Sequence, residues 1–194
     1  MPESYLKLRR NLGYIGLLLP ISLILFSVIS TKGCHIILPT ISDYYHTTVR
    51  NIFVGIICAI AVFLWSNEES DFQEKLLYKI AAFCAILVAF APTTNKNISC
   101  FVSNDIQLPE MVGYIHYIGA TLFFLILAYV TYFKFVEKEK GKTKASRYRI
   151  RVYKICGMGM FVSIILIAVY QLLIRSTFNL DDSILPPTFA LESI

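Results

Sequence analysis

Charged residues are scarce in this sequence, since Asp, Glu, Lys and Arg together make up only 16% of its 194 residues. Soluble domains carry about 25% charged and about 45–50% apolar residues. This chain is 56% hydrophobic, more than one core of this size can bury. The composition therefore argues against a soluble domain and favours a protein whose solvent is the membrane.

The motifs of the common enzyme classes are missing as well. The sequence has no glycine-rich phosphate loop, GxSxG, CxxC or HExxH. The net charge is +5, but the basic residues stand beside apolar runs, which is typical of membrane flanks and not of a nucleic-acid surface. We expect no cofactor and no nucleic-acid partner.

What the sequence does contain is apolar segments close to the length of a bilayer crossing, about 20 residues each. Each should be an α-helix, because backbone groups in lipid must bond within their own segment and the alternation of a membrane barrel is absent. We predict an all-α polytopic transmembrane helix bundle, a single integral membrane domain over residues 1–194, with five spans at 12–31, 51–66, 76–92, 112–135 and 155–174.

The tail over residues 175–194 leaves two interpretations open. Its Pro186-Pro187 pair, followed by TFALESI, is typical of a helix start. Either the design has six spans, with the last span missing or incomplete, or the tail lies on the outer surface as a short amphipathic piece.

Lysine and arginine set the predicted orientation. Basic residues precede the first helix, and nine more lie between 134 and 154. The positive-inside rule puts both in the cytoplasm, with four crossings between them. The segment NEESDFQEK argues weakly the other way, because acidic residues count for little in this rule. We expect an integral plasma (bacterial inner) membrane protein with a cytoplasmic N-terminus.

Two cysteines fall on the predicted outer side. Cys34 lies in the first outer loop and Cys100 in the second, whereas the other three cysteines lie inside helices. An oxidising compartment would permit a Cys34–Cys100 disulfide. The alternative is two unpaired thiols.

Polar residues gather at the same outer level. The candidate ligand-binding residues are Asp43, Tyr45, His46, Arg50, Glu110 and His116. Arg50 opens an apolar helix, where a buried guanidinium needs a carboxylate, a phosphate or carbonyl groups. Its partner is expected to be Asp43, Glu110 or an anionic ligand, unless its side chain reaches the lipid headgroups.

A metal site is the alternative use of this cluster. His46, His116 and Asp43 are the residue types of catalytic zinc sites. Membrane ceramidase-like hydrolases, however, supply several histidines from their helices, including a pair near the C-terminal end, whereas this sequence has three histidines in total and none after His116. We therefore predict no metal and expect these histidines to bond to their neighbours.

Four stretches carry a family resemblance: PTISDYYHTTVRNIFVGIICAIAVFLW, AAFCAILVAFAPT, IHYIGATLFFLILAYVTYFKF and RVYKICGMGM. The chain resembles uncharacterised bacterial polytopic membrane proteins that are distantly similar to the Frag/DRAM/Sfk-related domain-of-unknown-function membrane families. The resemblance implies six helices, the last beginning with a segment like PTFALESI, and it implies no enzymatic activity. Eukaryotic relatives are associated with lipid organisation and membrane trafficking.

The functional expectation follows from these features. We expect a non-enzymatic integral membrane protein whose outer-leaflet-facing polar pocket binds or organises a lipid or small amphiphile. The alternative is a metal-dependent membrane-embedded hydrolase that uses His46, His116 and Asp43. The expected partners are membrane lipids, together with a second copy of the chain or another membrane protein.

Overall fold

The computed structural model describes residues 3–30, 38, 40–67, 71–93, 109–139 and 143–169. The side chains of residues 3–12, 30 and 110 are not described. Within these ranges the chain is all-α, as predicted, with six α-helices. In chain order the elements are α1 (Glu3–Ser30), η1 (Ile41–His46), α2 (Arg50–Trp65), α3 (Phe72–Phe90), α4 (Glu110–Tyr129), η2 (Val130–Lys134), α5 (Phe135–Lys138) and α6 (Lys144–Val169).

Each predicted apolar segment coincides with a helix, and α4, η2 and α5 follow one another without a break. The η1 segment is a 3-10 helix and η2 is a π-helical turn. The largest differences are at the starts of α1 and α6, which begin well before the predicted residues 12 and 155. Hydropathy marks only the apolar part of a helix, while leucine, lysine, arginine and alanine in the flanks are good helix formers.

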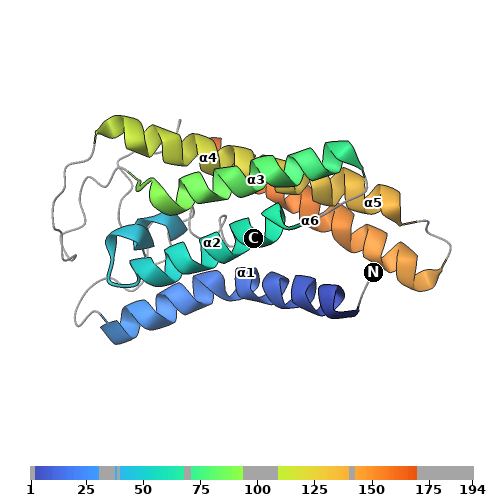
Figure 1. Cartoon of the computed structure of the whole chain (residues 1–194), viewed down its shortest axis with the longest axis horizontal. Coiled ribbons are helices and arrows are strands. Elements are labelled where there is room, and N and C mark those ends of the chain that lie inside the picture. Colours follow the sequence, from blue (N-terminus) through green and yellow to red (C-terminus); the bar gives the residue numbers. More distant parts are fainter. Residues whose placement is uncertain are drawn as a thin grey trace.

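The long helices run in alternating directions along one common axis (Figure 1). α3 is the central element and packs extensively against α2 on one side and α4 on the other. α6 packs against α4 and η2, whereas α1 makes fewer contacts, with α2 and η1. As a result, the polar connection before α2 and the basic start of α6 lie at opposite ends of the bundle (Figure 1).

Small residues set how closely the helices approach. α3 buries Ala81, Ala82, Ala85 and Ala89. On α4, a Cβ added at Gly119 would lie 3.4 Å from the Cys84 carbonyl oxygen, so α4 lies directly on the α3 backbone. Helix interfaces in membranes are enriched in such residues.

Two helices are long and apolar enough to cross a membrane, judged by length and composition: Met111–Lys138 and Lys144–Val169. The apolar helical stretches Gly13–Ile29 and Arg50–Trp65 are shorter. Two crossing-length helices alone are weak evidence, because the core helix of a soluble protein also has this length. The structure thus shows two such helices in the part of the chain it describes, and not five spans.

Candidate functional site

The polar stretch before α2 folds because its short side chains bond to its own backbone. The Asp43 N–H donates to the Thr40 hydroxyl at 3.1 Å, and the Thr40 N–H donates to the Asp43 carboxylate at 3.1 Å. This reciprocal pair is a capping box, which starts the η1 turn. The Thr47 hydroxyl ends the turn by donating to the Tyr44 carbonyl at 2.7 Å. The chain then enters α2 at Arg50.

His116 ties η1 to the ends of α3 and α4. Only 1% of this residue is exposed. Its Nδ1 lies 2.6 Å from the Ala91 carbonyl oxygen and its Nε2 lies 2.9 Å from the Ser42 hydroxyl. Because a carbonyl only accepts, Nδ1 carries the hydrogen and Nε2 of the neutral ring accepts from Ser42. His116 therefore joins three segments through two neutral hydrogen bonds.

Asp43 and His46 meet through Thr93, just beyond α3. The His46 Nε2–H donates to the Thr93 carbonyl oxygen at 2.9 Å and lies 3.1 Å from its hydroxyl. That hydroxyl donates to Asp43 at 3.4 Å. Burial raises the pKa of Asp43, while the bonds from Thr40 and the nearby His46 act in the opposite direction. The three residues form one connected polar network.

Arg50 is the exposed member of this cluster. One of its Nη2–H groups donates to the Tyr45 hydroxyl, and its guanidinium carbon lies 4.1 Å from the centroid of the Tyr45 ring. Among the described residues no carboxylate pairs with Arg50, and the Asp43 oxygens bond to Thr40 and Thr93 instead. Asp43 is therefore not the partner of Arg50, and the Glu110 side chain lies outside the described part.

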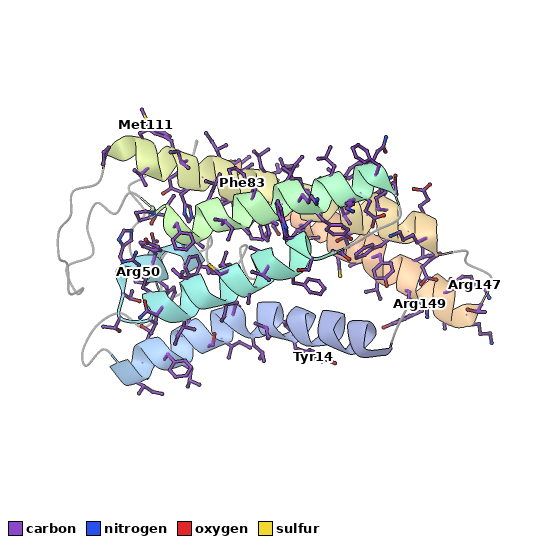
Figure 2. All side chains as sticks on the ribbon, in the orientation of Figure 1. Tyr14, Arg50, Phe83, Met111, Arg147 and Arg149 are labelled. Carbon is purple, nitrogen blue, oxygen red and sulfur yellow. The ribbon has the colours of Figure 1, made fainter. Side chains whose placement is uncertain are left out.

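The predicted site residues thus share one end of the molecule, where Figure 2 shows Arg50, with Met111 of α4 at the same end. Thr93 bridges Asp43 and His46, Arg50 contacts Tyr45, and His116 contacts Ser42. The predicted Cys34–Cys100 pair and the tail 175–194 lie outside the described residues. The remaining cysteines, Cys58, Cys84 and Cys156, are free.

The described residues include no group of three or more His, Cys, Asp or Glu side chains that could hold a metal ion. Both ring nitrogens of His116 already bond to the protein. His46 uses its Nε2 for Thr93. The geometry of this cluster therefore gives no support to a zinc-dependent reaction.

Sequence reasoning missed Ser42, Thr93 and the Ala91 carbonyl, on which the cluster depends. Ser42 belongs to the polar stretch TIS just before Asp43, and Thr93 belongs to APTT at the end of the third apolar segment. Such short polar residues are frequent at helix ends. Nothing in the sequence assigns them to a partner far along the chain.

A second polar cluster lies at the opposite end and was also missed. Asp71 caps α3 by accepting from the Gln73 N–H at 3.2 Å, and it pairs with Lys134 at 2.9 Å. Glu74 is 1% exposed and pairs with Lys138 at 2.8 Å. The hydrogen bond from Lys134 lowers the pKa of Asp71.

The start of α6 belongs to this second cluster. Arg149 donates to both Glu139 oxygens, at 2.6 and 3.0 Å, and Ser146 donates to Glu139 at 2.6 Å. The hydrogen bond from Arg149 lowers the pKa of Glu139. Asp71 and Glu74 from the acidic segment therefore lie at the same end as Lys134 and Lys138, where opposite charges pair.

No protein-family model, curated protein or solved structure matches this chain. Function must therefore be argued from the geometry of the two polar ends and from the apolar surface between them.

Proposed function

We propose that this chain is a polytopic helical membrane protein without catalytic activity, which binds the anionic group of a lipid or small amphiphile at its η1 end. The observation that carries the proposal is Arg50, an exposed guanidinium that contacts Tyr45 and has no carboxylate partner among the described residues. The family resemblance of the sequence points in the same direction.

The exposed apolar surface supports the membrane placement. In the most apolar windows of Met111–Lys138 and Lys144–Val169, only 28% and 11% of the residues are buried. The core helix of a soluble protein would be mostly buried. Burial in a protein core therefore does not explain why these two helices are so apolar. Side chains such as Leu17 (66% exposed), Ile118 (60%) and Ile165 (60%) face outward.

The separation of charge supports the proposed orientation. The cations at the start of α6 lie at one end, and Arg50 lies at the other (Figure 2). By the positive-inside rule the α6 start is cytoplasmic and η1 faces the outer leaflet. With α1, α2 and α3 as further crossings, the chain spans the bilayer five times.

Arg50 has the chemistry to bind an anion. Guanidinium offers five N–H donors, and the contact with Tyr45 uses one of them. Two parallel donors match a phosphate or carboxylate, and such charge-assisted bonds are about twice as strong as neutral ones. Because the Tyr45 ring holds the guanidinium from one side, less side-chain freedom is lost when a ligand binds.

The rival function is the metal-dependent hydrolase. It requires His116 to release either Ala91 or Ser42 before it can ligate a metal. Elemental analysis of the purified protein separates the two functions, because stoichiometric zinc would contradict the proposal of a lipid-binding protein without catalytic activity.

The test of the proposal is identification of co-purified lipids by mass spectrometry. We expect wild type to retain an anionic species that Arg50→Ala loses and Arg50→Lys partly keeps, because lysine preserves the charge without the paired donors. The matched control is Lys75→Ala, which removes one cation from the first turn of α3, near the opposite end (Figure 1). An unchanged lipid profile in Arg50→Ala would disprove the proposed site.

A further inference from the structure

An open apolar groove runs along α6 where this helix packs against η2. Its volume is about 490 Å³, and its lining includes Tyr132, Lys154, Ile155, Met158, Val162 and Leu166. The groove lies outside the η1 cluster.

The wall of the groove follows from the close approach of α6 to the π-helical turn. A Cβ added at Gly157 would lie 2.7 Å from the Tyr132 Cβ and 2.9 Å from its backbone nitrogen. The two backbones are therefore almost in contact, and the Tyr132 side chain stands beside the α6 face that bears Met158 and Val162. The groove is thus a product of helix packing and not of one mobile side chain.

A row of cations leads into this groove. Arg147, Arg151 and Lys154 follow one another at intervals of four and three residues, so they lie on one face of α6. Ile155, Met158 and Val162 continue the same face toward the other end of the helix. The surface is thus cationic over the first turns of α6 and apolar beyond Lys154.

Among the described residues, these three cations differ from their neighbours because they form no ion pair. Lys134, Lys138 and Arg149 all pair with carboxylates. In the described part of the chain, no ion pair is formed by Arg147, Arg151 or Lys154, and all three are exposed. The charge on this face is therefore available for an external anion.

The dimensions match a phospholipid in one leaflet. The distance along α6 from Lys154 to Leu166 is about 18 Å at a rise of about 1.5 Å per residue. Half of the hydrocarbon core of a bilayer is about 15 Å thick. A phosphate at the cationic end thus places an acyl chain along the whole apolar part of the groove.

We propose that this groove holds one acyl chain of an anionic phospholipid whose phosphate is bound by Arg151 and Lys154. The inference shares with the proposed function the placement of the bundle in a membrane, but it uses no residue of the η1 cluster. It assigns the protein a second lipid site, in the leaflet at the basic end.

The test uses the full chain in phosphatidylcholine vesicles that contain a small share of spin-labelled lipid. The motionally restricted component of the electron spin resonance spectrum gives the preference of the protein for phosphatidylglycerol over phosphatidylcholine. Each basic residue near an anionic surface is worth about a fivefold change in binding. We therefore expect Arg151→Gln/Lys154→Gln to lower the preference by up to about 25-fold.

The matched control is Lys75→Gln/Lys79→Gln, which removes the same charge from α3 near the same end. It should keep the wild-type preference. Val162→Trp fills the groove without changing the charge and should lower the preference too. The loss caused by Arg151→Gln/Lys154→Gln should persist in an Arg50→Ala background, so failure of the η1 site and failure of this site give different results.

Three outcomes overturn the inference. In the first, Arg151→Gln/Lys154→Gln keeps the wild-type preference. In the second, Lys75→Gln/Lys79→Gln lowers the preference by as much, which shows that the effect follows from net charge alone. In the third, Val162→Trp has no effect, which shows that the acyl chain lies elsewhere or that another part of this chain or a second copy fills the groove.

Discussion

His116 connects the η1 segment to the rest of the bundle. It is buried, and its two ring nitrogens bond to groups from different segments, the Ala91 carbonyl and the Ser42 hydroxyl. Replacing the His116 ring leaves the buried Ala91 carbonyl without this hydrogen bond. The free-energy cost of an unsatisfied buried group is larger than the net stabilisation that the hydrogen bond provides. The arrangement of Arg50 and Tyr45 thus depends on a residue that contacts neither.

Replacing His116 with leucine should therefore destabilise the fold. We expect His116→Leu to lower the free energy of unfolding by about 2–4 kcal/mol, because one buried and one partly buried hydrogen bond are lost. Thermal unfolding in detergent measures the change. The control is Tyr114→Leu, at a position that is 64% exposed on the same helix. Equal shifts in the two variants would show that the His116 bonds contribute nothing specific.

Asp43 gives a pH dependence with a definite sign. Burial raises its folded-state pKa above the unfolded value of 3.8. The folded state then binds more protons between the two pKa values, so the stability from Asp43 is present below pH 3.8 and is lost as pH rises through the folded pKa. The amide introduced by Asp43→Asn has no proton to lose in this range, so the variant lacks this dependence.

The difference in Tm between Asp43→Asn and wild type should consequently grow in favour of the variant as pH rises. His46 is the nearby charge that opposes this trend. Melting curves of both proteins in one detergent, from about pH 3 to about pH 7, provide the measurement. A difference that stays constant over this range would refute the raised pKa.

At the scale of single residues, the sequence predicted which polar groups share one end but not which groups bond. Asp43 was one of the expected partners of Arg50, but Arg50 contacts Tyr45 and Asp43 bonds to Thr40 and Thr93. His116 and His46 bond to backbone carbonyls at positions 91 and 93. Every residue has a carbonyl, so a partner of this kind has no sequence signature.

At the scale of helices, α6 and η2 approach each other very closely at Gly157, more closely than α4 and α3 do at Gly119. The π-helical turn Val130–Lys134 presents the Tyr132 backbone to Gly157. π-helical turns inside α-helices are rare and are often found at functional sites. The only sequence sign of this contact was that a small residue at 157 permits close packing.

Gly157→Ala should be strongly unfavourable. The added methyl would lie 2.7 Å from Tyr132 Cβ and 2.9 Å from its nitrogen, and overpacking of this kind costs about 1–3 kcal/mol. Gly55→Ala is the control, because nothing lies within 4 Å of the added atom. It should instead gain about 0.5–1 kcal/mol from helix propensity. Unfolding in detergent compares them, and a neutral Gly157→Ala would contradict the packing described.

Helix existence was predictable from the sequence, whereas helix starts were not. Apolar runs located every long helix, but α1 and α6 extend into charged flanks that hydropathy does not detect. The acidic segment after α2, which argued weakly against the predicted orientation, supplies Asp71 and Glu74 as partners for Lys134 and Lys138. These two carboxylates therefore lie beside the basic residues and pair with them.

In the whole molecule, two ends of different character are separated by an apolar surface. The η1 end is a network of neutral and singly charged groups around Asp43, His46 and His116. The other end carries ion pairs and the cationic face of α6. Between them, α4 and α6 expose large apolar side chains, which a bilayer would cover.

Accessibility labelling in intact cells tests this placement most directly. In a background with all five native cysteines replaced by serine, single cysteines are placed at exposed Thr48, beside η1, or exposed Ala145, at the start of α6. A membrane-impermeant maleimide should label Thr48→Cys in intact cells and Ala145→Cys only after permeabilisation. Labelling of both positions in intact cells, or of Ala145→Cys alone, would contradict the account.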